Sequence, residues 1–137
     1  MADVHTPSVR SYNMSKIKGK NTRPELRVRK FLHANGFRFR LYDKRLPGTP
    51  DIILPKYKTI VFVNGCFWHG HENCKYFVVP KTRTEWWKDK IVQNKKADNE
   101  NYAKLTEMGW KVIIIFECKL KREFRTNTLN ELVANIY

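Results

Sequence analysis

Three short apolar runs constrain most strongly what this chain can fold into. They are DIIL at 51–54, TIVFV at 59–63 and WKVIIIFEC at 110–118. Short continuous apolar runs are typical of strands that are buried on both faces, because a half-exposed strand alternates polar and apolar positions. The first two runs, separated by PKYK, predict two buried strands. The third is apolar enough to predict a central strand of a sheet.

A helix is expected to precede the first of these strands. In TRPEL at 22–26, Thr22 can cap the helix, Pro24 fits its first turn, and Glu25 stands where a capping box requires an acid. Asn35 followed by glycine predicts its end.

The remaining elements complete a small mixed α/β domain. Strict alternation in FRFRLY at 37–42 predicts a half-buried strand, and periodic apolar positions predict helices from 84 to about 107 and over 129–136. The expected order is α-β-β-β-α-β-α, with helices packed on a short sheet in one domain over 22–137. Residues 1–21 are polar and basic, and we expect an arm there that contacts a partner.

The net charge points to that partner. Among 137 residues, 27 Lys and Arg against 13 Asp and Glu give a formal charge of +14. Such an excess favours nucleic acid as the partner, the alternative being a well-solvated basic surface. No apolar run is long enough for a membrane span, and the N-terminus lacks the apolar region of a signal peptide. These features predict a cytoplasmic protein with no membrane partner.

All three cysteines fall into one candidate metal set. It consists of Cys66, His71, Cys74 and Cys118. Three thiolates and one imidazole form a closed tetrahedral zinc site, which is structural because no position remains for water. The alternative is three unrelated free cysteines in a reducing compartment.

Asp51 is the first candidate for catalytic chemistry. A carboxylate that enters an apolar strand is costly unless it is paired or holds a cation. Many nucleases place a divalent metal on such an acid, with a second acid and a lysine on the next strand. The next strand here, TIVFVNG, has neither, and the alternative for Asp51 is a turn or strand cap.

His69 and a group of aromatic residues are the other candidates. His69 is left over by the zinc set, and a neutral imidazole can take a proton from water, although a lone loop histidine is more often ordinary. Trp86 and Trp87 point about 100° apart on a helix, which predicts one in the core and one exposed. Exposed aromatics on a basic protein suggest wedges between base pairs, and the alternative is a hydrophobic cluster over the zinc loop. The aromatic candidates are Phe67, Trp68, Trp86 and Trp87.

Taken together, these segments resemble the very-short-patch repair (Vsr) endonucleases. The matching blocks occur in order along nearly the whole chain: MADVH at 1–5, RSYNM at 10–14, TRPEL at 22–26, LPGTPD at 46–51, GCFWHGH at 65–71, VPKTRTEWW at 79–87 and GWKVIIIFEC at 109–118. The resemblance implies a restriction-endonuclease-like fold of the PD-(D/E)xK superfamily with a structural zinc. It also implies nicking of one DNA strand 5′ to the thymine of a T:G mismatch, the product of 5-methylcytosine deamination.

The resemblance also implies roles for individual residues in the reaction. Asp51 would bind two Mg²⁺ ions at the scissile phosphate, and the backbone carbonyl of Val63 would be a further ligand. His69 would activate or position the attacking water, and Glu25 matches an acid near the metals. The family pattern has His where this chain has Asn64, whose amide cannot shuttle a proton but can hydrogen-bond a phosphate oxygen.

For the remaining site residues, the resemblance implies contacts with zinc and with DNA. Cys66, His71, Cys74 and Cys118 match the zinc ligands. Phe67, Trp68 and Trp87 match aromatics that wedge into DNA beside the mismatch, and Met14 would enter from the opposite groove. We expect a monomer assisted by mismatch-repair accessory proteins. Two alternatives stay open: a restriction-type enzyme without mismatch dependence, and a zinc-stapled DNA-binding module with a decayed active site.

Overall fold

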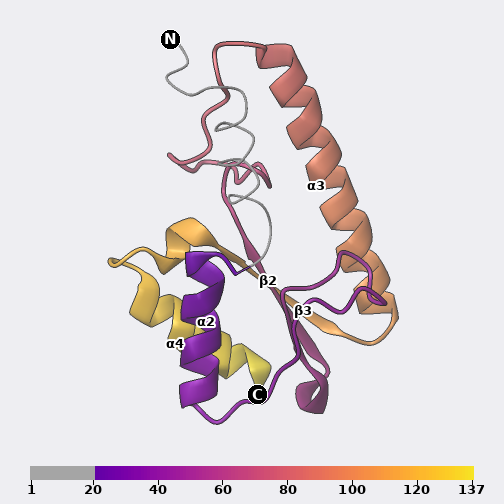
Figure 1. Ribbon diagram of the computed structural model, residues 1–137, viewed down its shortest axis with the longest axis vertical. Coiled ribbons are helices and arrows are strands. Elements are labelled where there is room, and N and C mark those ends of the chain that lie inside the picture. Colours follow the sequence, from indigo (N-terminus) through magenta and orange to yellow (C-terminus); the bar gives the residue numbers. More distant parts are fainter. Residues whose placement is uncertain (1–20) are drawn as a thin grey trace.

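The structure, a computed structural model, describes residues 21–137. The predicted basic arm therefore lies outside the described residues except for Asn21, as does Met14. Within the described part, a three-stranded mixed sheet is flanked by helices, which confirms the predicted mixed α/β class (Figure 1). The finer assignment to the restriction-endonuclease-like folds stays a prediction.

The sheet contains strands β1 (Ile52–Leu54), β2 (Thr59–Asn64) and β3 (Lys111–Phe116), in that spatial order. Strand β1 is antiparallel to β2, with Ile52 opposite Val61. The short connection η1 (Pro55–Tyr57) and Lys58, whose φ of 50° is left-handed, turn the chain back between them. Strand β2 is parallel to β3, and the crossover between them contains the long helix α3 (Thr84–Glu107).

The prediction that the run at 110–118 is the central strand is wrong. Within the described residues, β2 is central and β3 lies at an edge. All six residues of β2 are buried, whereas Ile114 in β3 is 39% exposed. The apolar composition of a strand indicates that it packs against a core, and it carries no information about whether a further strand pairs along its free edge.

The predicted strand at 37–42 is also absent from the described fold. Arg40 alone bridges to Ile53, through two backbone hydrogen bonds of 2.8 Å. Two residues later the chain turns, because Tyr42 has a left-handed φ of 51°. Its N–H still donates to the carbonyl of Pro50. The alternation correctly indicated a buried Phe37, but Leu41, on the same face of the predicted strand, is 38% exposed, and the backbone leaves the extended conformation at Tyr42.

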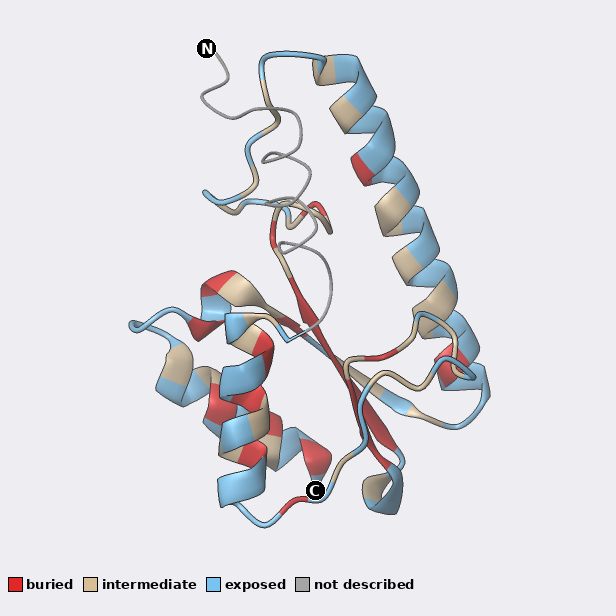
Figure 2. Ribbon diagram, viewed as in Figure 1, coloured by how far each residue is buried: buried red, intermediate tan, exposed pale blue. Residues whose placement is uncertain are grey.

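Helices cover both faces of the sheet (Figure 1). Helix α2 (Arg23–Ala34) begins as predicted, with the Thr22 side chain accepting the N–H of Glu25. Helix α4 (Arg125–Ile136) begins four residues before the predicted start at 129. Helices α2 and α4 pack with one face of β2, including Val61 and Val63, in the larger hydrophobic core. On the other face, Ile60 and Phe62 pack with Leu105 of α3. Buried residues accordingly follow the sheet and the inner faces of α2 and α4 (Figure 2).

No helix within residues 21–137 is long and apolar enough to cross a membrane.

The packing of α2 predicts a sharp difference between two leucines of the same helix. Leu32 is fully buried in the larger core, and Leu26 is 47% exposed. Leu32→Ala should lower the free energy of unfolding by about 2–5 kcal/mol, because it leaves a cavity. Leu26→Ala should change it by less than about 1 kcal/mol. Urea unfolding followed by circular dichroism measures both, and equal losses would contradict this packing.

Candidate active site and metal cluster

All four predicted catalytic residues line one cavity of about 620 Å³. The cavity lies where the end of β2, the start of α2 and the middle of α3 converge. Its lining includes the predicted Glu25, Asp51, Val63, Asn64 and His69, together with Trp68, Asp98, Tyr102 and Glu117. Residues that lie far apart in sequence are therefore brought to one place.

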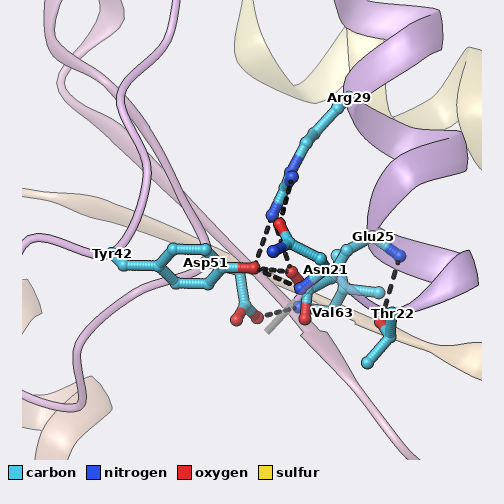
Figure 3. Close-up of polar contacts among 7 residues, drawn as sticks. All are labelled: Asn21, Thr22, Glu25, Arg29, Tyr42, Asp51 and Val63. Atoms are coloured by element: carbon cyan, nitrogen blue, oxygen red, sulfur yellow. Dashed lines mark hydrogen bonds and ion pairs between the residues drawn. The ribbon is translucent and has the colours of Figure 1, made fainter. Parts of the chain in front are cut away.

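Asp51 lies directly before β1 and faces the end of β2. Its Oδ2 accepts the backbone N–H of Val63 at 2.7 Å (Figure 3). Burial, together with the nearby charge of Glu25, raises the pKa of Asp51 to about 7. The Val63 hydrogen bond, His69 and Arg29 act in the opposite direction on the same pKa. A carboxyl group of this kind is poised to exchange its proton for a metal cation near neutral pH.

The backbone of Val63 also faces Asp51. In an extended strand, the N–H and C=O of one residue point to the same side. Since the Val63 N–H is directed at Asp51, its carbonyl is on the same side of β2. The geometry therefore suits the predicted pairing of a carboxylate and a carbonyl as metal ligands.

Glu25 is a charged residue that is only 1% exposed, and two side chains compensate its burial. Its Oε2 accepts from Arg29, one helical turn later, at 3.0 Å, and from the hydroxyl of Tyr42 (Figure 3). Arg29 in turn donates to Asn21 at 2.8 Å. The carboxylate is thus engaged by these two side chains, while Thr22 provides the helix cap. Arg29 and Tyr42 were not predicted, and the i, i+4 spacing of Glu25 and Arg29 was the available signal.

His69 is paired with an acid that the sequence analysis missed. Its Nδ1 lies 2.6 Å from Oδ2 of Asp98 on α3. A carboxylate on one ring nitrogen fixes the orientation of an imidazole and leaves the other nitrogen available. The sequence does show that Asn94, Asp98 and Tyr102 are spaced four residues apart, which places three polar side chains on a single face of the helix. Nothing in the sequence showed that this face meets the loop after β2.

Asn64, the last residue of β2, is almost fully buried beside the same helix. Its Nδ2 donates to the Tyr102 hydroxyl at 2.8 Å. Further along the loop, the carbonyl of Trp68 accepts a hydrogen bond of 3.0 Å from the side chain of Asn94 on α3. Gly70 has a φ of +59°, and a Cβ there would lie 2.7 Å from Cγ2 of Ile91. Only glycine therefore allows the loop to approach α3 this closely.

The four predicted zinc ligands form one cluster. The ligand atoms of Cys66, His71, Cys74 and Cys118 all lie within 4.8 Å of one another. It is the only group of three or more potential metal ligands of this kind found within residues 21–137. Cys118 lies in η2 (Glu117–Leu120), after the end of β3, whereas the sequence placed it at the end of the strand.

Local contacts prepare the cluster for a metal. The His71 ring stacks on Phe116, with centroids 3.9 Å apart, and its Nδ1 lies 3.4 Å from the Cys118 sulfur. Burial raises the pKa of the Cys66 thiol to about 12. A buried thiol of this kind becomes a thiolate only when a cation compensates its charge, and Cys₃His is a set typical of structural zinc. The residues therefore fit a tetrahedral metal ion.

The aromatic candidates form a cluster of their own beside the loop. Trp87 lies 5.3 Å from Phe67 and 5.8 Å from Trp68, measured between ring centroids. Trp86 contacts Trp87 at 4.7 Å and is 46% exposed. The prediction that one tryptophan of the pair enters the core is wrong, because Trp87 is only half-buried within this cluster. Both rings thus belong to one partly exposed aromatic surface.

Comparison with known proteins finds one matching family and several similar nicking enzymes and a mismatch endonuclease. The family described as DNA mismatch endonuclease Vsr matches residues 2–75. The type II nicking enzyme V.NmeAIP of Neisseria meningitidis is 48% identical over 137 residues, covering 99% of this chain and 97% of the relative. The type II nicking enzyme V.XorIIP of Xanthomonas oryzae is 46% identical, covering 88% of each chain. The DNA mismatch endonuclease Vsr of Escherichia coli is 44% identical, covering 88% of this chain and 77% of the relative.

The raised pKa of Asp51 predicts that an isosteric amide there stabilises the protein. Because the folded pKa lies above the ordinary value of 3.8, wild-type stability falls as pH rises from about 4 to about 7. Asp51→Asn removes this loss, so its gain should grow over that range and then level off. A shift of this size is worth a few kcal/mol, at about 1.4 kcal/mol per pKa unit. Thermal melts from pH 4 to pH 8, without added magnesium, measure it.

Asp43→Asn is the matched control. The pKa of Asp43 is lowered by its hydrogen bonds from Arg45, which is the opposite sign. This variant should gain no stability at pH 8. A pH-independent gain in Asp51→Asn would contradict the burial of a charged carboxylate.

Proposed function

Because this chain belongs to the Vsr family of DNA mismatch endonucleases, we propose that it nicks one strand of duplex DNA 5′ to the thymine of a T:G mismatch. This is the incision that starts very-short-patch repair of deaminated 5-methylcytosine. The observation that carries the proposal is the cavity in which Glu25, Asp51 and His69 meet. The proposal extends to a monomer that acts at the nucleoid in the bacterial cytoplasm, with mismatch-repair accessory proteins.

The cavity suits magnesium as the catalytic metal. Asp51 and the carbonyl of Val63 would supply the oxygen ligands that Mg²⁺ prefers. Glu25 lines the same cavity and is paired with Arg29. When bound, two Mg²⁺ ions would stabilise the attacking and leaving oxygens of an in-line displacement at the phosphate. Asp51 would give up its proton to bind the metal. Because burial raises its pKa to about 7, metal binding should depend on pH near neutrality.

His69 is the proposed base. With Nδ1 held by Asp98, its Nε2 is the nitrogen left to take a proton from the attacking water. Asp98 keeps the ring in one orientation and stabilises the imidazolium that forms. Hydrolysis then leaves a 3′-hydroxyl and a 5′-phosphate if the water attacks the phosphorus from the side opposite the 3′-oxygen.

Mismatch selectivity would come from the aromatic surface. Phe67, Trp68 and Trp87 are proposed to enter the duplex beside the mispair, and Met14, outside the described residues, from the other groove. Unstacking a base step costs a few kcal/mol, and less at a mismatch. The net charge of +14 supports binding to phosphates along the duplex.

We propose zinc as the metal of the Cys66–His71–Cys74–Cys118 cluster. Its closed Cys₃His set leaves no position for water, so its role would be structural. It would tie the loop that carries His69 and the aromatics to η2, and so hold that loop in place.

The nicking proposal predicts mismatch-dependent cleavage that requires two residues of the cavity. With magnesium and duplexes labelled on each strand, wild type should nick the thymine strand of a T:G duplex and leave the matched duplex intact. His69→Gln should slow nicking by roughly 10²–10⁴-fold, the usual effect of losing a general base. Asp51→Asn should abolish it. Gel assays measure all three, with the exposed Glu107→Gln as a control of unchanged rate.

Other results would overturn this assignment in different ways. Cleavage of both strands of matched DNA would indicate a restriction-type enzyme. DNA binding without cleavage in any metal would indicate a binding module.

The zinc proposal predicts one equivalent of zinc in the purified protein, measured by inductively coupled plasma mass spectrometry. His71→Ala and Cys74→Ser should each lose the metal and lower the melting temperature, because the cluster then lacks a ligand. His33→Ala removes an exposed histidine and should retain zinc. A folded wild-type protein with no metal would contradict the proposal.

A further inference from the structure

Helix α3 carries a second polar group to the cavity, one turn beyond Asp98. The ring of Tyr102 packs against Phe62, with centroids 5.0 Å apart, beside the smaller hydrophobic core. Its hydroxyl is anchored by Asn64, whose Nδ2 lies 2.8 Å away, and Tyr102 lines the same cavity as Asp51. Neither the catalytic nor the metal-binding roles proposed above use this hydroxyl.

The direction of the hydrogen bond leaves the Tyr102 proton unused. An amide N–H can only donate, so the Tyr102 oxygen is the acceptor from Asn64. Within residues 21–137, no hydrogen bond in which this hydroxyl donates is formed. Burial raises the pKa of Tyr102 to about 12, helped by the charges of Asp98 and Asp51. The hydroxyl therefore keeps its proton throughout the physiological pH range.

The surroundings indicate what would accept this proton. The cavity is lined by the acids Glu25, Asp51, Asp98 and Glu117. An anionic ligand that enters among these acids needs hydrogen-bond donors. A neutral hydroxyl is well suited, since it donates without neutralising the carboxylates that are to bind cations. The oxygens of a phosphodiester are such acceptors, and hydroxyl side chains commonly donate to DNA phosphates.

We propose that Tyr102 contacts the DNA substrate by donating its hydroxyl hydrogen bond to a non-bridging oxygen of a backbone phosphate in the cavity. Asn64 is then a positioning residue, because its amide occupies one lone pair of the hydroxyl and thereby directs the proton. This assignment rests on the proposed function in taking a duplex with a T:G mismatch as the ligand, and it does not require that the duplex is nicked. It also gives Asn64, where this chain departs from the family pattern, a specific task.

The first test removes the hydroxyl and keeps the ring. Tyr102→Phe preserves the contact with Phe62 and should weaken binding of a T:G duplex by about 10- to 100-fold, the usual effect of losing a hydrogen bond to a charged group. Fluorescence anisotropy with calcium in place of magnesium measures binding without cleavage. Tyr57→Phe, in the core packing against Phe37 and remote from the cavity, is the matched control and should bind as wild type does. Equal binding by Tyr102→Phe and wild type would overturn the proposal.

A second test identifies the phosphate itself. A methylphosphonate, which replaces one non-bridging oxygen by a methyl group, is placed in turn at each phosphate within three nucleotides of the mismatch. At one of them the modification should weaken binding by wild type about tenfold more than binding by Tyr102→Phe, because the variant has already lost the contact. A merely structural role for Tyr102 predicts equal losses in both proteins at every phosphate, which would overturn the proposal.

The same comparison tests Asn64. Asn64→Ala should reduce the coupling between Tyr102 and that phosphate, and the double variant with Tyr102→Phe should bind no more weakly than Tyr102→Phe alone. Additive losses in the double variant would show that Asn64 does not act through Tyr102. Because each readout is binding, it is independent of nicking: failure of wild type to nick would sink the proposed function while the phosphate coupling is still measured.

Discussion

One face of helix α3 holds the segment from the end of β2 to Gly70, and the rest of the candidate site depends on that contact. Successive turns of the helix bring Ile91 against Gly70, Asn94 to the carbonyl of Trp68, Asp98 to His69 and Tyr102 to Asn64. The spacing of three and four residues is that of a single helical face. Polar residues on this face explain why a helix of 24 residues buries only Ile91 and Leu105.

A metal ion in the Cys/His cluster would restrain the same segment. Cys66 and His71 bracket the stretch that carries Phe67, Trp68 and His69, and Cys118 lies in η2, so a shared ion would link the two. A loop held both by a helix and by such an ion would lose little further entropy when it binds a partner. Such a loop could present half-exposed aromatic rings beside a charged cavity without their collapse into the core.

The residues of the candidate site could be chosen from their types, and the structure brings them together, whereas the hydrophobic pattern misplaced two of the strands. The capping residue Thr22 and the buried runs in β1 and β2 reflect local rules, and the structure agrees with them. The alternation at 37–42 indicated the burial of Phe37 correctly but not the exposure of Leu41, which is 38% exposed, nor the absence of a ladder, because the left-handed φ of Tyr42 interrupts the extended backbone. The edge position of β3 depends on which strands lie beside it, and no property of its own residues specifies that.

The sequence by itself determined which groups are available: a Cys₃His set, an acid before a buried strand, a histidine and aromatics on one short loop, and a large positive charge. Only the tertiary structure decided how they are paired. Asp98 with His69 and Tyr102 with Asn64 join residues 29 and 38 positions apart. Such pairs form only when helix α3 lies at a particular angle to the sheet and at a particular position along its own axis. That geometry results from packing over the whole core, and no local stretch of sequence contains it.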